Sequence, residues 1–296
     1  MTTSPPAAGT AALLGAGVMN RAVAPHLRRA GWTLRLYSRR PAGWLEAGAT
    51  ADEVRRSPAE AAAGADVVLS MVSDDEASHA VWQGPEGALR TLRAGALAVE
   101  GSTLSAHRVD EWAAAVDAVG AGAVDAPVTG SVPRATAGTL VAFVGGSDHD
   151  FARYERFSDC FTERRYRLGP VGAAARFKLA HNLFAAVVLA GFAEHLALVE
   201  RLGLDPELVV DIMSSYGWGQ GVASGYGPSM LRDEYEDVRC RLGLMAKDVA
   251  YAAELARETG LDTPLTAAVR NGFATAVAEG LGDLDMGAVR RVVGPR

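Results

Sequence analysis

The stretch that decides the fold is TAALLGAGVMN, residues 10–20. Residues 10–14 are mostly apolar and predict a buried strand, and Gly15-Ala16-Gly17 then leads into a helix that runs to about residue 30. In such a unit the first glycine permits the tight turn, and the second lets the backbone approach a pyrophosphate at the helix N-terminus. Asn20 stands where the fingerprint has its third glycine, which serves close packing of the helix on the strand. We therefore predict a dinucleotide-binding turn; the alternative is an ordinary strand-to-helix turn.

Strand-like and helix-like segments alternate after this turn. Strands are expected at 32–38, 66–72, 96–100, 123–126, 140–144 and 164–168, with helices at 105–119 and 151–161 among them. This alternation predicts a parallel sheet covered by helices on both faces.

The pattern changes after Gly169-Pro170. Residues 171–202 carry apolar side chains at helical spacing and no proline, which predicts one long helix. Further helices are expected at 206–214, at 230–255 with a break, and at 264–279, whereas 216–228 (YGWGQGVASGYGP) is too rich in glycine for regular structure. We predict an α/β Rossmann domain over residues 1–168. An all-α C-terminal domain for substrate binding and dimerisation follows over 169–296, beginning with a long interdomain helix.

Composition excludes several classes of function. The formal net charge is -6 and 22% of residues are charged, which argues against nucleic acid or an anionic membrane as a partner. The two cysteines have no metal-site spacing, and the longest apolar run, residues 183–193, is too short to span a bilayer. The first ten residues lack the features of a secretory signal. We expect a soluble, cytoplasmic protein with a small-molecule substrate and no metal.

Lysine is rare in this chain. Of its 29 basic residues, only Lys178 and Lys247 are lysines. Arginine stays protonated, whereas a desolvated lysine can lose its proton, so these two positions are candidates for chemistry that arginine cannot perform. The alternative is chance.

The end of the second predicted strand indicates which cofactor is used. NAD-specific sites usually place an acid about 20 residues after the glycines, to bind the ribose 2′-hydroxyl. Here Ser38, Arg39 and Arg40 occupy that region, and a guanidinium pairs well with a 2′-phosphate. We predict NADP (NADPH) rather than NAD; the alternative is that both arginines form a solvated surface pair.

Five motifs, in order, resemble those of the β-hydroxyacid dehydrogenase family. This family includes 3-hydroxyisobutyrate dehydrogenases and tartronate semialdehyde reductases. The motifs are LLGAGVMNRAVAPHLRRAG (13–31), GSTLS (101–105), DAPVTGSVPRATAGTL (125–140), GPVGAAARFKLAHN (169–182) and LMAKDVAYA (244–252). The resemblance extends from Leu13 to about Val293 and implies an NAD(P)-dependent oxidoreductase, related to 6-phosphogluconate dehydrogenase.

The resemblance implies roles for individual residues. Lys178 matches the catalytic lysine, Asn182 matches the asparagine one helical turn later, and Lys247 matches a lysine that helps to bind the cofactor. The cofactor is expected to contact Gly15, Ala16, Gly17, Val18, Met19, Ser38, Arg39, Arg40, Met71, Val72, Ser102, Thr103 and Lys247. The substrate is expected to contact Ser102, Thr129, Gly130, Ser131, Lys178, Asn182 and Trp218.

Some residues depart from the family pattern. The family's usual Ser-Gly-Gly is Thr129-Gly130-Ser131 here, and the middle glycine before the catalytic lysine is Ala174. These changes leave the reaction type intact but put the usual small carboxylate substrates in doubt. Tyr216, Trp218 and Tyr226 are candidates for lining a pocket suited to something larger or more apolar; the alternative is a packed loop.

The sequence therefore favours an NADP(H)-dependent oxidoreductase that interconverts a small carbonyl acid and its hydroxy acid. Lys178 would act as general acid and base, and Asn182 would orient the substrate oxygen or the ammonium. One alternative is an imine reductase-like enzyme, whose members commonly carry Asp or Tyr in place of this lysine. Another is a non-catalytic cofactor-binding scaffold, whose members have lost it. Asp248 is assigned no chemistry. The long helix and the family both suggest a homodimer or homotetramer.

Overall fold

The fold is described from a computed structural model, which covers residues 9–217 and 219–293. The chain forms two compact units that divide between Lys178 and Leu179. This boundary lies inside helix α8 (Ala173–Arg201), whereas the sequence placed it at 168/169. The difference arises because the first turn of α8 packs on the sheet, through Ala175.

The first unit is built on an eight-stranded sheet. The strand order is β2-β1-β3-β4-β5-β7-β6, with β8 paired to β7. The strands are β1 (Gly9–Leu14), β2 (Trp32–Tyr37), β3 (Val67–Ser70), β4 (Leu97–Glu100), β5 (Gly122–Asp125), β6 (Val128–Thr129), β7 (Leu140–Gly145) and β8 (Thr162–Gly169).

The prediction of a parallel sheet is confirmed for β1 to β5 and is wrong for the remainder. β7 runs antiparallel to both β5 and β6, and β8 is parallel to β7. The connection between β6 and β7 is residues 130–139 and contains the short helix α6 (Ser131–Ala137). That connection is shorter than the crossover of a dozen or more residues that joins parallel neighbours, so the chain reverses direction.

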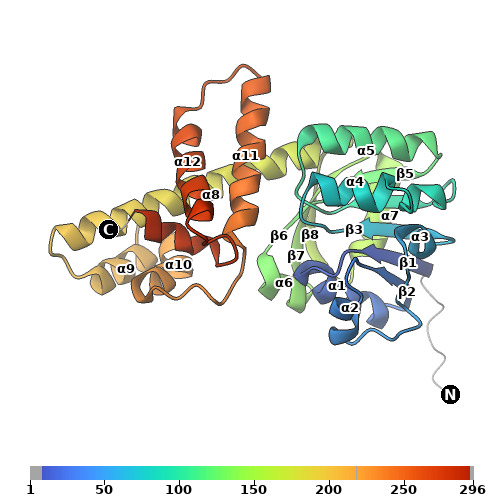
Figure 1. The fold of residues 1–296 in the computed structure, drawn as a ribbon, viewed down its shortest axis with the longest axis horizontal. Coiled ribbons are helices and arrows are strands. Elements are labelled where there is room, and N and C mark those ends of the chain that lie inside the picture. Colours follow the sequence, from blue (N-terminus) through green and yellow to red (C-terminus); the bar gives the residue numbers. More distant parts are fainter. Residues whose placement is uncertain (1–8, 218, 294–296) are drawn as a thin grey trace. The chain divides into compact units, whose positions relative to one another are not determined.

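Helices cover both faces of the sheet, as predicted (Figure 1). One face packs against α1 (Val18–Arg29), α2 (Ala42–Glu46), α6 and α7 (Asp148–Ser158). The other packs against α3 (Pro58–Ala62), α4 (Asp75–Gln83), α5 (Ala106–Ala118) and the start of α8, with the 3-10 turn η1 (Ala88–Arg90) nearby. Side chains alternate between the faces along each strand, so Val99 lies in the first core and Ala98 in the second.

The second unit is helical, as predicted. It contains most of α8, then α9 (Pro206–Ser215), α10 (Gln220–Arg232), α11 (Leu242–Glu258), α12 (Pro264–Ala278) and the 3-10 turn η2 (Met286–Val292) around one apolar core. By length and composition alone α8 would be able to cross a membrane, with a mean hydropathy of 1.8. Glu194, which ends the longest apolar run of the sequence, does not lower the mean hydropathy enough to exclude a membrane span by this criterion. The core helix of a soluble protein satisfies the same criterion.

The prediction that residues 216–228 are irregular is wrong, because α10 begins at Gln220. Gly227 is buried, and a Cβ there would lie 2.6 Å from Cγ1 of Val210 in α9. The glycine therefore allows the two helices to approach closely, while Ala223 and Met230 fill the core. Packing of this kind outweighs the low helix propensity of glycine.

Candidate active site

The glycine turn lies at the carboxyl end of β1, against the segment that follows β3. Gly15 has a φ of 100°, and a Cβ there would lie 2.6 Å from the carbonyl oxygen of Met71, so only glycine fits. A Cβ on Gly17 would meet nothing closer than 3.9 Å, which leaves this backbone open to a ligand. Gly17 gives α1 no side-chain cap, and the first turn of the helix contains no acidic residue. These features fit the pyrophosphate of a dinucleotide.

Asn20 stands where the fingerprint has its third glycine, and its side chain forms hydrogen bonds to the strand end. The side chain is fully buried, and its Nδ2 donates to the carbonyl oxygens of Leu14, at 3.0 Å, and Gly15, at 2.8 Å. It thereby links the first turn of α1 to the last carbonyl of β1 and to the carbonyl of the glycine that follows it. The departure from glycine at this position is thus compatible with the turn geometry.

The end of β2 carries two exposed arginines. Ser38 Oγ donates to the carbonyl oxygen of Arg40 at 2.7 Å, and Trp44 Nε1 donates to that of Tyr37 at 3.1 Å. These bonds fix the main chain here. Within the part of the chain that the structure describes, neither Arg39 nor Arg40 forms an ion pair, so both guanidinium groups can meet an anion.

Predicted cofactor residues from neighbouring strands come together in the first unit. The Val72 amide donates to Ser102 Oγ at 2.9 Å, which joins the segments after β3 and β4. A Cβ on Gly101 would lie 3.1 Å from Cγ of Met71, so these segments also pack closely. A side-chain hydrogen bond from Ser102 to Glu100 partly offsets the rise that burial causes in the pKa of that carboxyl, and it further fixes the Ser102 hydroxyl. The structure therefore brings Gly15, Met71, Val72 and Ser102 to one edge of the sheet.

A buried acid, Glu100, holds the Ser102 segment. Its Oε1 accepts from the Ser102 amide at 3.0 Å, and its Oε2 accepts from Ser78 Oγ and Trp82 Nε1, both at 2.9 Å. Burial raises the pKa of the Glu100 carboxyl, and these hydrogen bonds offset the shift only in part. Arg108, also buried, donates from Nε to Ser78 Oγ at 3.3 Å. Sequence reasoning missed Glu100.

The substrate signature has a strained backbone. Gly130 has a φ of 122°, and a Cβ there would lie 2.6 Å from Cδ of Arg134. Ser131 has a φ of 55°, and within residues 9–217 and 219–293 only Asp233 shares positive φ among non-glycine residues. At this position the glycine expected from the family pattern would carry no such strain.

His26 in α1 fixes the helix that follows the signature. Its Nε2 lies 3.1 Å from the carbonyl oxygen of Ala135 and 3.0 Å from that of Thr136, near the end of α6. Arg29 donates to His26 Nδ1 at 2.8 Å, which assigns the ring proton to Nε2. The helix that follows the pyrophosphate turn is therefore joined to the helix that follows Thr129-Gly130-Ser131.

Lys178 lies at the end of the first unit, on the early turns of α8. Its side chain is buried, with 7% of its surface exposed. Asp125, at the end of β5, accepts from the Gly172 amide at 2.9 Å and from the Ala175 amide at 2.8 Å. The helix that carries the lysine is thus anchored to the sheet one turn before it.

The second unit brings Asn182 and Lys247 together through Asp248. Asn182 Nδ2 donates to Asp248 Oδ2 at 2.6 Å, and Lys247 Nζ lies 2.7 Å from Asp248 Oδ1. Lys247 Nζ also lies 4.9 Å from the centre of the Tyr251 ring. Asp248 is buried, so its charge is compensated mainly by this lysine. It is therefore the shared partner of two predicted site residues.

The two described tyrosines of the predicted aromatic lining lie in different environments. Trp218 lies outside the described residues. Tyr216 is 75% exposed, whereas Tyr226 packs on the core of the helical unit beneath Arg239, whose guanidinium lies 4.6 Å from the ring centre. Nothing in this arrangement assigns the two tyrosines to a pocket.

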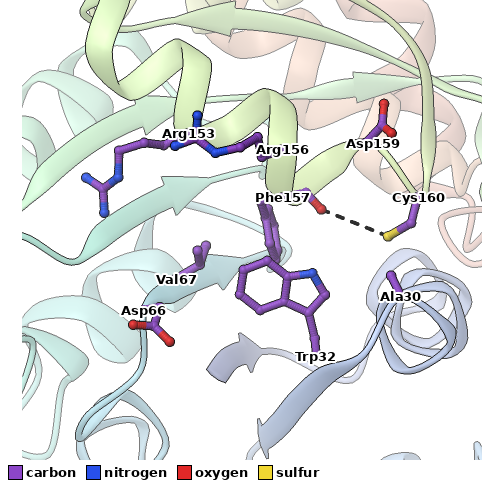
Figure 2. A pocket seen from close by; sticks show the side chains of 9 residues that line it. All are labelled: Ala30, Trp32, Asp66, Val67, Arg153, Arg156, Phe157, Asp159 and Cys160. Atoms are coloured by element: carbon purple, nitrogen blue, oxygen red, sulfur yellow. Dashed lines mark hydrogen bonds between the residues drawn. The ribbon is translucent and has the colours of Figure 1, made fainter. Parts of the chain in front are cut away.

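A cavity of about 480 Å³ lies elsewhere in the first unit (Figure 2). Trp32 and Val67, the first residues of β2 and β3, line it together with Phe157 of α7. It therefore opens at the amino ends of the strands, whereas open α/β sheets bind ligands beyond the carboxyl ends. It contains none of the predicted site residues.

The two halves of the chain each match a family model. Residues 10–169 match the NAD binding domain of 6-phosphogluconate dehydrogenase, and residues 172–293 match the NAD-binding model of NADP-dependent 3-hydroxyisobutyrate dehydrogenase. The chain belongs to the β-hydroxyacid dehydrogenase family. The resemblance inferred from five motifs and the predicted fold class are thereby confirmed.

Individual members of the β-hydroxyacid dehydrogenase family are similar over most of the chain. The mitochondrial 3-hydroxyisobutyrate dehydrogenase of Mus musculus is 31% identical, over 83% of this chain and 75% of that protein. The chloroplastic glyoxylate/succinic semialdehyde reductase 2 of Arabidopsis thaliana is 29% identical, over 93% of this chain and 77% of that protein. A solved 3-hydroxyisobutyrate dehydrogenase of Mycobacterium tuberculosis with L-serine is 28% identical, with a TM-score of 0.85 over 96% of this chain and 99% of that chain.

Membership of the β-hydroxyacid dehydrogenase family makes this chain an oxidoreductase with NAD(P)-binding domains. Sequence reasoning missed Glu100 and Asp125, and it gave Asp248 no role. The signal for the first two was an acid as the last residue of a buried strand, in LAVE and GAVD. Buried charges of this kind are rare unless they are hydrogen-bonded or paired.

Proposed function

We propose that this chain is an NADP(H)-dependent oxidoreductase that interconverts a small carbonyl acid and its hydroxy acid, with Lys178 as general acid and base. The observation that supports this most is the burial of Lys178 on a helix whose start is anchored by Asp125. A lysine in a desolvated position can give up and regain its proton, which arginine cannot do.

We propose separate roles in hydride transfer, proton transfer and substrate binding for the cofactor and the site residues. A bound nicotinamide would supply the hydride in reduction and accept it in oxidation. Lys178 Nζ donates a proton to the substrate oxygen in reduction and takes it back in oxidation. Asn182 lies one turn later on α8, and its Nδ2 is held by Asp248, so its Oδ1 is left to orient the ammonium or the substrate hydroxyl. Ser102 and the backbone amides of Thr129-Gly130-Ser131 hold the substrate carboxylate.

NADP is the proposed cofactor because of the charge at the end of β2. Arg39→Ala and Arg40→Ala should each weaken NADPH binding by about tenfold or more, since charge-assisted hydrogen bonds contribute about 1.5–3 kcal/mol. Binding of NADH, which lacks the 2′-phosphate, should change little. Fluorescence titration of both cofactors tests this, and equal loss for both would refute NADP specificity.

Assembly is proposed from the surface of the helical unit. Among the described residues, large apolar side chains such as Phe184, Leu198 and Leu202 are more than half exposed. We propose that they are covered in a homodimer or homotetramer, as contiguous exposed apolar surface on a monomer is uncommon. Sedimentation velocity should then show a dimer or larger, and Leu198→Glu should shift it toward monomer. A monomeric wild type would contradict this.

The enzyme is further proposed to act in the cytoplasm on a small molecule, without nucleic acid or a membrane. The net charge of -6 supports the absence of nucleic acid or an anionic membrane as a partner. The activity is tested by following NADPH and NADH absorbance with carbonyl acids, hydroxy acids and cyclic imines. Turnover of a carbonyl acid or hydroxy acid with NADP(H) is expected. Turnover of imines alone would favour the imine reductase alternative, and binding of NADPH without turnover of any substrate would favour the scaffold.

A further inference from the structure

Two buried carboxylates lie side by side where the sheet meets the proposed site. Glu100 and Asp125 are the last residues of β4 and β5 and are partners in the parallel register. The residues before them, Val99 and Val124, both lie in the core of the opposite face. Since side chains alternate along a strand, both acids point to the face covered by α4, α5 and the start of α8. Each is only 1% exposed.

Each acid accepts main-chain amides from a segment assigned to the reaction. Glu100 Oε1 accepts from the Ser102 amide at 3.0 Å. Asp125 uses both oxygens, accepting from the Gly172 amide at 2.9 Å and the Ala175 amide at 2.8 Å, three residues before Lys178. The side chains themselves do not carry out the reaction; they hold the backbone that carries Ser102 and Lys178.

We propose that Glu100 and Asp125 are positioning residues that fix the Ser102 segment and the Lys178 turn of α8 to one edge of the sheet. The proposal rests on the proposed function of Lys178 and Ser102. Its physical basis is that a misplacement of about 1 Å in a reacting group can lower the rate by about 10²-fold. Glu100 and Asp125 are register partners on adjacent strands, which lie about 4.8 Å apart. The spacing of the strands therefore sets the distance between the Ser102 segment and the Lys178 turn.

Both oxygens of each acid accept hydrogen bonds, whereas a side-chain amide can accept with only one of its two polar atoms. Asp125 meets two amide donors, and an asparagine would present its own NH₂ to one of them. Glu100 meets the Ser102 amide together with Ser78 and Trp82, so a glutamine would direct its NH₂ at the Trp82 N–H. The charge of Asp125 also lies at the amino end of α8, where the helix dipole favours a negative group.

Asp125→Asn tests the first anchor, and Asp110→Asn is the matched control. Asp110 also binds the first turn of α8, through Arg176 at 2.6 Å, but its side chain is 52% exposed. We expect Asp125→Asn to lower kcat about tenfold or more per NADPH-binding site, with the Kd for NADPH within about twofold of wild type. Asp110→Asn should keep kcat within about twofold, since an exposed ion pair contributes little. Counting active sites by NADPH titration removes any effect of partial unfolding.

Glu100→Gln tests the second anchor through the Ser102 segment. We expect the KM for the acid substrate to rise about fivefold or more, with a smaller change in kcat, because Ser102 is assigned to substrate binding. Adding Trp82→Phe removes the N–H that the glutamine opposes, so the double variant should recover most of the lost affinity. If Glu100 had a purely structural role, Glu100→Gln would lower thermal stability without changing KM more than kcat. The added Trp82→Phe change would then not restore substrate affinity.

Amide hydrogen exchange makes the test independent of turnover. Asp125→Asn should speed exchange at Gly172 and Ala175 about tenfold or more relative to wild type, whereas Asp110→Asn should not. If the wild type turns over no acid, the proposed function fails, and the exchange result still decides whether Asp125 anchors the turn. Unchanged exchange, or wild-type kcat and KM in both Asp125→Asn and Glu100→Gln, would overturn the proposal.

Discussion

The sheet unit and the helical unit hold their proposed functional groups in different ways. In the sheet unit, buried acids accept main-chain amides, as Asp125 does from Gly172 and Ala175. In the helical unit, Asp248 contacts the side chains of Asn182 and Lys247. Segments beyond strand ends and the first turn of α8 leave main-chain amides without ladder or helix partners, so they need an external anchor, whereas the interiors of α8 and α11 satisfy their own backbone. Loops and helix starts therefore need their backbone fixed, whereas helix interiors need only their side chains oriented.

The largest effect on stability is expected in the helical unit, from Asp248→Ala. This change removes the shared partner of Asn182 and of the largely buried Lys247, and with it the carboxylate 2.7 Å from the lysine Nζ. Breaking a buried pair in this way costs about 3–5 kcal/mol, and we expect about 3 kcal/mol here because Lys247 keeps some exposure. Urea unfolding measures the change. A loss below about 1 kcal/mol would mean that the side-chain anchor is weak.

Glu100→Gln gives the corresponding test of the sheet unit and should depend on pH. Burial raises the pKa of Glu100 above the ordinary 4.5, so the folded state retains this proton at a higher pH than the unfolded state does. Wild-type stability from this group therefore falls as pH rises from about 4.5 toward the folded pKa, whereas glutamine does not titrate.

The Gln variant should therefore be less stable by about 2 kcal/mol at about pH 5, because it leaves the Trp82 N–H without an acceptor. The deficit should shrink as pH rises, since only the wild type loses stability. Urea unfolding across this range measures both proteins. A deficit that grows with pH would show that the folded state favours the charged carboxylate.

The smallest effect on the free energy of unfolding is expected from alanine substitutions at two glycines of α10. Gly227→Ala should cost about 1 kcal/mol, because the new methyl group would lie 2.6 Å from Cγ1 of Val210. At Gly225 the nearest atom to an added Cβ is 3.9 Å away, so Gly225→Ala should stabilise the protein by about 0.5–1 kcal/mol through helix propensity. Thermal unfolding distinguishes them, and equal shifts would refute close packing of α9 on α10.

Much of this fold follows from local sequence patterns. The strands β1 to β5 and the long helix α8 were predicted because each presents a continuous run of one periodicity. The antiparallel direction of β7 and the helix α10 were not, because both depend on tertiary context. Connection length decides the direction of β7, and the contact with Val210 makes Gly227 favourable in a helix.

The site residues likewise divide into those with a local sequence signal and those whose role depends on the fold. Residues recognised by type and spacing, such as Gly15, Ser102 and Lys178, were named from the sequence. Their supports were not, since Asp125 lies 50 residues from Ala175 in the chain and 47 from Gly172. An acid that ends an apolar strand is a local signal, but its partner is set only by the fold.

The proposed reaction depends on proton transfer by Lys178. The most direct measurement is the steady-state rate of Lys178→Ala at saturating NADPH, together with a fluorescence titration of NADPH binding to the same variant. We expect kcat to fall by about 10²–10⁴-fold, the usual contribution of a positioned acid or base, while the Kd for NADPH stays within about twofold. Wild-type turnover in Lys178→Ala would contradict this role.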